Sequence, residues 1–232
     1  MGYNSYGNSF KNTSPIVLNL IIANVLAFLA QMVLGGTDNV NNITNLFALH
    51  HYKSEYFKIW QLLTHMFMHG GFMHLLFNMF ALYMFGSTIE KIWGPKRFLF
   101  FYIACGIGAA IMQMGSYAYD YSNIDKMALG IEDYTKYQQI LSANFTVGAS
   151  GAIMGVIAAF GYLFPNTEMI IMPIPIPIKA KWAVLGFIAI DLFSGIAGRP
   201  GDNVAHFAHV GGAITGFLIV YFQNKTNKKS FY

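Results

Sequence analysis

Residues 147–164 read VGASGAIMGVIAAFGYLF, a stretch without a single charged side chain. A helix needs roughly 20 apolar residues to cross the hydrocarbon core of a bilayer, which is about 30 Å thick. Across the whole chain of 232 residues, 55% are hydrophobic and only 10% are charged, whereas a soluble domain carries about 25% charged residues. The stretch is therefore predicted to be a membrane-embedded helix.

Five other apolar runs of similar length lie on either side of this stretch. The fifth of the six along the chain is the shortest and contains Asp191. The segment 169–178 before it contains three prolines, which do not fit a regular helix and favour an extended connection. We therefore predict an all-α membrane protein with a compact bundle of six transmembrane helices. The runs cover residues 15–34, 66–85, 98–114, 147–164, 182–197 and 204–222.

The basic residues between the runs predict an orientation. With a cytoplasmic N-terminus, nine Lys and Arg residues fall on the inner side and five on the outer side, as the positive-inside rule prefers. We expect residues 1–14 to be a short cytoplasmic segment, 15–222 the six-helix domain, and 223–232 a basic cytoplasmic tail. The expected location is the cell membrane, with the active site open to the outer side. The segments 35–59 and 115–146 would then be long outer loops.

The distribution of charge argues against a nucleic-acid-binding protein, and the cysteine content argues against a protein held together by disulfides or thiolate metal clusters. The net charge of +4 could suggest a nucleic-acid partner, but the basic residues form no stripe on any one helix, so we predict no nucleic-acid binding. Cys105 is the only cysteine, which rules out an intrachain disulfide or a thiolate metal cluster.

Polar side chains inside the runs are costly and so are candidates for function. Ser150 lies between Gly148 and Gly151, a pattern that permits a sharp turn into a helix and a close approach of a substrate backbone. An isolated serine in a membrane helix more often bonds a backbone carbonyl or packs against a neighbour. However, backbone N–H groups at a helix start are free to stabilise an oxyanion.

A serine nucleophile needs a base, and His209 is the histidine that we select. GxxxG pairs occur on both runs, Gly151 with Gly155 and Gly212 with Gly216, so the two helices can pack with their backbones close together. This approach would bring Ser150 within hydrogen-bond reach of His209. His206, one turn earlier, is the rival base.

His74 and Asn78 are four residues apart and therefore lie on one face of the second predicted helix. They could donate to the tetrahedral intermediate and form an oxyanion site with the backbone N–H of Ser150. The alternative is that both residues only join helices by hydrogen bonds. His65 and His69 have the spacing of a metal pair, but a third ligand and an HExxH motif are lacking, so we expect a structural role, no metal and no cofactor. Asp191 is open to two interpretations, a functional intramembrane charge or a residue near the outer surface.

Taken together, these motifs resemble the rhomboid intramembrane serine proteases. The resemblance rests on Trp60 to His65 (WQLLTH), then His69, His74 and Asn78, then Gly148 to Gly151 (GASG), and finally Ala208-His209 with Gly212 and Gly216. It implies a nucleophile at Ser150, a base at His209, no acidic third member, and an oxyanion site at His74 and Asn78. It also implies substrates that are transmembrane proteins, held among membrane lipid.

One departure from the family pattern concerns the first loop. Many rhomboids have Trp-Arg where this chain has Trp60-Gln61, so a neutral amide replaces a guanidinium and puts the anchoring of the loop in question. The segment 194–203, rich in glycine, is a candidate mobile cap. Two other functions stay open: a transporter or channel lined by histidines, and a non-catalytic relative that binds membrane clients.

Overall fold

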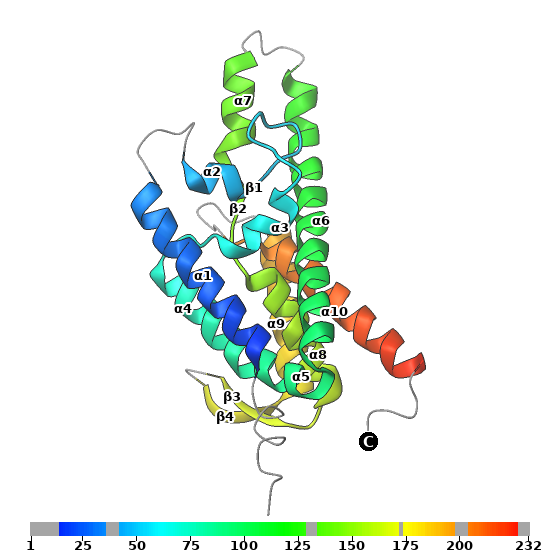
Figure 1. Cartoon of the computed structure of the whole chain (residues 1–232). Coiled ribbons are helices and arrows are strands. Elements are labelled where there is room, and N and C mark those ends of the chain that lie inside the picture. The colour runs from blue at the N-terminus through cyan, green and yellow to red at the C-terminus, as the bar shows by residue number, and fades with distance from the viewer. Residues whose placement is uncertain (1–13, 36–41, 129–133, 172–173, 198–203, 227–232) are drawn as a thin grey trace, which may run out of the picture.

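The computed structural model describes residues 14–35, 42–128, 134–171, 174–197 and 204–226. Most of these residues are helical (Figure 1). Within these ranges, four helical segments are long and apolar enough to cross a membrane: Pro15–Leu34, Phe72–Trp93, Pro95–Ser122 and Ala180–Ala197. The prediction of a helical membrane protein is confirmed, whereas the count of six spans stays a prediction.

The first span, α1 (Pro15–Leu34), has the bounds predicted from the sequence. Proline at its first position has no N–H to leave unsatisfied. The next free N–H groups, of Ile16 and Val17, donate to the buried carboxylate of Glu90 at 2.9 and 2.8 Å. A negative charge at a helix N-terminus is favourable, and this one also joins α1 to the end of the second span.

The second span begins later than predicted. Residues 61–67 form two short turns, α3 (Gln61–Thr64) and η2 (His65–Phe67), and α4 (Phe72–Ala81) begins only after Gly70 and Gly71. The helix then continues through a π-helical turn, η3 (Leu82–Gly86), into α5 (Ser87–Trp93). Gly94, with φ of +80°, turns the chain into the next helix.

The long segment predicted as an outer loop, 115–146, is mostly helical. The third span, α6 (Pro95–Ala128), has 34 residues and is longer than the roughly 20 that a bilayer core requires, and α7 (Tyr134–Ala143) folds back beside it (Figure 1). Tyr117, Tyr121 and Leu141 form a small buried cluster between them. The prediction of a loop was wrong here because polar and charged residues are also compatible with a helix that lies outside the membrane.

The segment predicted as the first outer loop, described from residue 42 and called the first outer segment below, is attached to this hairpin by a short sheet. It contains α2 (Ile43–Phe47) and β1 (Leu49–His50), and β1 pairs antiparallel with β2 (Phe145–Thr146), just before the serine motif. The Tyr117 hydroxyl on α6 lies 2.7 Å from the Thr146 hydroxyl. The sheet and this hydrogen bond fix the approach of the chain to Ser150.

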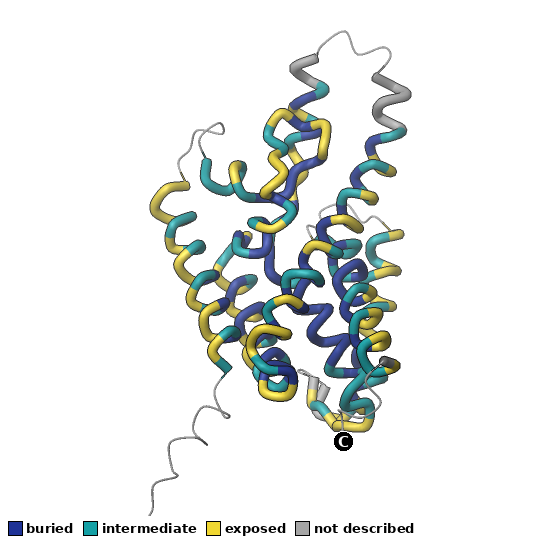
Figure 2. The backbone as a smooth tube through the Cα atoms, turned by 45° about the vertical axis from the view of Figure 1, so that its right-hand side comes forward, coloured by how far each residue is buried: buried dark blue, intermediate teal, exposed yellow. Residues whose placement is uncertain are grey.

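The helix that carries the serine, α8 (Ser150–Leu163), lies in the middle of the bundle. Ten of its 14 residues are buried, in contrast to the exposed outer faces of α1 and of α9 (Ala180–Ala197) (Figure 2). The last helix, α10 (His206–Thr226), packs against α6 and α8. The central position of α8 explains its small side chains, because three helices approach it closely.

The segment predicted to be extended is confirmed as such. It forms a hairpin of β3 (Glu168–Ile171) and β4 (Ile174–Lys179), which pair antiparallel at the end of the molecule where α5 also lies (Figure 1). The segment 194–203, predicted as a mobile cap, is described only in part. Residues 194–197 belong to the helix α9, and residues 198–203 lie outside the described residues.

Candidate active site

Ser150 and His209 meet as predicted. The Oγ atom of Ser150 lies 2.8 Å from Nε2 of His209. Ser150 is the first residue of α8, and His209 lies in the first turn of α10. A hydroxyl and an imidazole at this distance have the geometry of a nucleophile and its general base.

Close packing of α8 against α10 makes this distance possible. A Cβ on Gly212 would collide with the backbone of Gly151, and a Cβ on Gly216 would collide with that of Gly155. The GxxxG pairs therefore face one another, as expected from the sequence. Helix α6 holds the start of α10 from the other side, where the Ala208 N–H donates to the side chain of Gln113 at 3.2 Å.

Asp191 is the residue of this site that the sequence did not assign. Its Oδ1 and Oδ2 atoms lie 3.1 and 3.2 Å from Nδ1 of His209, on the ring edge opposite Ser150. Oδ1 also lies 2.7 Å from Nδ1 of His206. The rival base His206 therefore contacts the carboxylate. The only signal for Asp191 in the sequence was an ionisable group within an apolar run.

The same three side chains are the group of described residues best suited to hold a metal ion. Asp191, His206 and His209 each offer a ligand atom, and these atoms lie within 4.8 Å of one another. Carboxylate and imidazole are ligand types that Zn²⁺ accepts. In this structure the two imidazoles bond to the carboxylate itself.

His74 lies beside the serine, and the position that a Cβ on Gly148 would occupy, called the gap below, lies between them. A Cβ on Gly148 would lie 2.9 Å from Cε1 and Nε2 of His74 and 3.5 Å from the Ser150 hydroxyl. Gly148 has φ of +128°, a conformation that favours glycine. The Nδ1 atom of His74 accepts a long hydrogen bond, 3.4 Å, from the Gly70 N–H, which leaves Nε2 directed at the gap.

Asn78 lies one turn after His74 on α4, also as predicted. It is buried, and its side-chain Nδ2 has no hydrogen-bond partner among the described residues. A buried amide donor without a partner is unfavourable unless a ligand or water completes it. The structure thus supplies a free donor on the helix face that carries His74.

The loop before α4 supports this arrangement. The carbonyl of His65 accepts from the Gly148 N–H at 2.9 Å, and the His65 Nδ1 atom lies 2.9 Å from the carbonyl of Gln61. Backbone groups of His69 bond to the side chain of Gln31 on α1. The His65 side chain thus bonds within the loop, whereas His69 takes part through its backbone, and the structural role expected for its imidazole stays a prediction.

Gln61 anchors the first outer segment despite its neutral side chain. Its Nε2 donates to the carbonyls of Tyr56, Asn45 and Leu46, and its Oε1 accepts from the His50 N–H. Trp60 adds a hydrogen bond from its indole to the Leu46 carbonyl at 3.0 Å. The amide thus fills the anchoring role that the departure from Trp-Arg had put in question.

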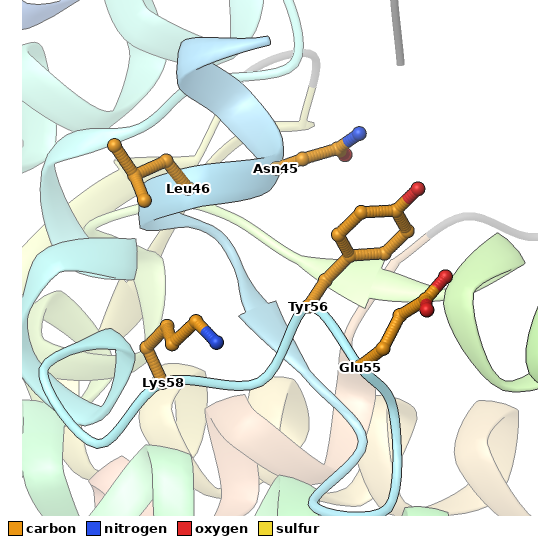
Figure 3. A pocket seen from close by; sticks show the side chains of 5 residues that line it. All are labelled: Asn45, Leu46, Glu55, Tyr56 and Lys58. Carbon is orange, nitrogen blue, oxygen red and sulfur yellow. The ribbon is translucent and has the colours of Figure 1, made fainter. Parts of the chain in front are cut away.

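A pocket lies within this outer segment. It is lined by Asn45 and Leu46 from α2 and by Glu55, Tyr56 and Lys58 from the following loop (Figure 3). None of these side chains belongs to the group around Ser150. The pocket is therefore a feature of the outer segment and separate from the candidate active site.

Comparison with known proteins agrees with this site. Residues 56–225 match the family described as the Rhomboid domain. The chain is 32% identical to rhomboid protease AarA of Providencia stuartii over 88% of this chain and 70% of that protein. It is 29% identical to rhomboid protease GluP of Bacillus subtilis over 90% of this chain but only 35% of the relative. A mitochondrial relative, Rhomboid protein 1 of Saccharomyces cerevisiae, is 29% identical over 70% of this chain and 41% of its own length.

These matches define a class of membrane-embedded proteases. The chain belongs to the rhomboid family.

Proposed function

We propose that Ser150 is the nucleophile and His209 the general base with which this rhomboid protease hydrolyses peptide bonds of membrane proteins. The observation that carries the proposal is the 2.8 Å contact between Oγ and Nε2. In the first step Oγ attacks the scissile carbonyl carbon while its proton passes to Nε2 of His209. Collapse of the tetrahedral intermediate then breaks the C–N bond, and the imidazolium protonates the leaving amine.

The resulting acyl-enzyme is hydrolysed by the same pair. His209 accepts a proton from a water molecule as that water attacks the ester carbon. The proton then returns to Oγ of Ser150 as the C–O bond breaks. A substrate carboxylate is released, and the serine hydroxyl is restored.

The oxyanion of each intermediate would lie in the gap beside Gly148. Nε2 of His74 borders this gap, and the Asn78 amide is a free donor on the same helix face. Backbone N–H groups in the first turn of α8, including that of Ser150, have no acceptor within their own helix. Donors preorganised in a site of low water content are worth several kcal/mol in such reactions, about 3 for a single donor.

The length of α8 supports cleavage within the membrane. With 14 residues it is about 21 Å long, shorter than a hydrocarbon core of about 30 Å. Its C-terminal end leads to the β3–β4 hairpin, and its serine end lies toward the first outer segment (Figure 1). We place Ser150 below the outer surface, where transmembrane substrates can reach it from the lipid and water from the outer side.

Charge distribution supports the topology and location. Lys91, Lys96, Arg97, Lys179 and Lys181 all lie near the end of the molecule that carries α5 and the hairpin. By the positive-inside rule this end is cytoplasmic, as are both termini. We propose the cell membrane as its location, in the orientation that opens the site to the outer side.

The test is cleavage of a model transmembrane substrate by purified protein in detergent. Wild type, Ser150→Ala and His209→Ala are compared, and retention of fold is checked by thermal unfolding. Both variants should lose nearly all activity. Cleavage by Ser150→Ala would refute the proposal. Absence of cleavage by wild type, together with metal- or proton-dependent ion flux that Ser150→Ala leaves unchanged, would favour a transporter.

A further inference from the structure

Asp191 extends the pair of Ser150 and His209 into a linear array. The carboxylate of Asp191 on α9 lies 3.1 Å from Nδ1 of His209 on α10. Nε2 of the same imidazole lies 2.8 Å from the Ser150 hydroxyl on α8. The three groups come from three different helices that converge at one depth of the bundle. We propose that Asp191 is a positioning residue that orients His209 and sets its tautomer, and this inference rests on the proposed protease function.

The chemistry of the carboxylate fixes the direction of the hydrogen bonds. An ionised carboxylate can only accept, so Nδ1 of His209 must carry a proton. In the neutral imidazole the lone pair then lies on Nε2, the atom that faces the Ser150 hydroxyl. This is the tautomer that a general base requires. The same carboxylate stabilises the imidazolium that forms when His209 has taken the serine proton.

His206 has a distinct part in this arrangement. It lies 2.7 Å from the same Oδ1 atom, so its Nδ1 also donates to Asp191. The side chains of Asp191, His206 and His209 are 13%, 13% and 17% exposed, and a charge at this depth is unfavourable without partners. Two donors hold the carboxylate in one place. His206 therefore orients Asp191, and Asp191 in turn orients His209.

Packing between α9 and α10 does not depend on Asp191 alone. One turn later on α9, a Cβ added to Gly195 would lie only 3.1 Å from the Phe207 ring and 3.2 Å from the Cβ of His206, so the two helices pack closely there as well. A variant that keeps the shape of Asp191 should therefore keep the helices together. Asp191→Asn is nearly isosteric and retains one acceptor oxygen, but it removes the charge and replaces the second acceptor oxygen with an NH2 donor.

The expected kinetic effect of Asp191→Asn is on the chemical step. We expect kcat to fall by roughly 100-fold or more, with KM within about twofold, because substrate binding does not involve the carboxylate. We also expect the acidic limb of the pH–rate profile to move to lower pH, since the imidazolium loses its counter-charge. The titratable groups that face His209 are Asp191 on α9, His206 on α10 and His74 on α4, and only the first is changed.

The experiment measures kcat, KM and the pH profile for wild type and Asp191→Asn, with Asp120→Asn as the matched control. Asp120 is exposed on α6 and undergoes the same chemical change away from the site. The rate of labelling of Ser150 by a fluorophosphonate is measured in parallel, because it needs no peptide substrate. The proposal is supported if labelling is slower and the acidic limb of the pH–rate profile is displaced in Asp191→Asn but not in Asp120→Asn. Partial rescue by Asp191→Glu would support it further.

Two results would overturn it. The first is an Asp191→Asn variant with the kcat, labelling rate and acidic limb of wild type. A loss of activity that is fully explained by a lower unfolding temperature would count in the same way. The second is loss of wild-type activity in EDTA with recovery in Zn²⁺, which would make the three side chains metal ligands. Inactive Ser150→Ala and His209→Ala alongside a wild-type-like Asp191→Asn would leave the proposed function intact. Cleavage by Ser150→Ala would reject the function instead.

Discussion

The backbone carbonyl of Gly151 on α8 occupies the place where a side chain on Gly212 of α10 would lie. This contact sets the separation of the two helices, and the separation sets the distance between Ser150 and His209. The chemistry of the site is therefore tied to a packing contact in which neither reacting side chain takes part.

We expect Gly212→Ala to reduce both stability and activity. The added Cβ must push α10 away from α8, and overpacking of this kind costs roughly 1–3 kcal/mol. Gly186→Ala is the control, because a Cβ on Gly186, on α9, would meet nothing within 4 Å. Thermal unfolding in detergent and the cleavage rate measure the two effects. Equal stability and equal activity of the two variants would contradict this account of the helix contact.

A separate prediction concerns the gap beside the serine. Gly148→Ala should lower kcat by at least tenfold, because the new Cβ would contact the His74 ring and occupy the proposed oxyanion position. Backbone strain at positive φ costs of the order of 1 kcal/mol in any such variant. Gly94→Ala controls for strain, since Gly94 also has positive φ but has open space around it. Comparable losses of kcat in both variants would show that strain, and not obstruction, is responsible.

Gln61 should be essential for the structure of the first outer segment. Gln61→Leu keeps the approximate volume but removes the hydrogen bonds of the amide to three carbonyls and to the His50 N–H. Leu46 keeps its bond from the Trp60 indole, whereas a buried group that is left unpaired costs about 1–3 kcal/mol. We expect a lower unfolding temperature and faster proteolysis of residues 42–60. Gln113→Leu, which removes the bond to the Ala208 N–H on α10, should leave proteolysis of this segment unchanged. Resistance of the Gln61 variant to proteolysis would disprove the anchoring role.

The stability of the same segment should depend on pH through His50. Burial lowers the pKa of His50 from 6.5 to about 4. Between these two values the unfolded state binds the proton and the folded state does not, so this contribution to stability is present above pH 6.5 and is lost as pH falls toward 4. The maximum loss is on the order of 3 kcal/mol.

The measurement is the unfolding temperature of wild type and His50→Phe from pH 7 to pH 4. Phenylalanine can occupy the same place between the rings of Tyr56 and Phe145, which lie 5.6 and 5.5 Å from that of His50. The variant should show a smaller decrease in unfolding temperature over this range. Parallel curves for the two proteins would mean that His50 does not carry the pH dependence.

Sequence patterns predicted the parts of this fold that depend on hydropathy and spacing. The bounds of α1 and the contact of Ser150 with His209 followed from apolar length and from the paired glycines. The start of α4 was placed too early because Met66 to Met68 are as apolar as the helix after them, and only the local turn at Gly70 and Gly71 separates the two.

Long-range contacts explain what the sequence could not supply. Asp191 is eighteen residues from His209 along the chain, and nothing in either local pattern indicates that α9 brings them together. The outer extension of α6 was missed for a different reason. Its polar side chains look the same in a loop and in a solvated helix, and only packing of Tyr117 and Tyr121 against Leu141 on α7 decides between them.

The most direct test of the central claim is to identify the activated nucleophile. Purified protein is treated with a fluorophosphonate, which reacts with activated serines, and the modified residue is mapped by mass spectrometry in wild type, His209→Ala and His206→Ala. The account predicts one adduct, on Ser150, that is lost in His209→Ala and retained, at a reduced rate, in His206→Ala. An adduct on another residue, or equal labelling of Ser150 in His209→Ala, would contradict it.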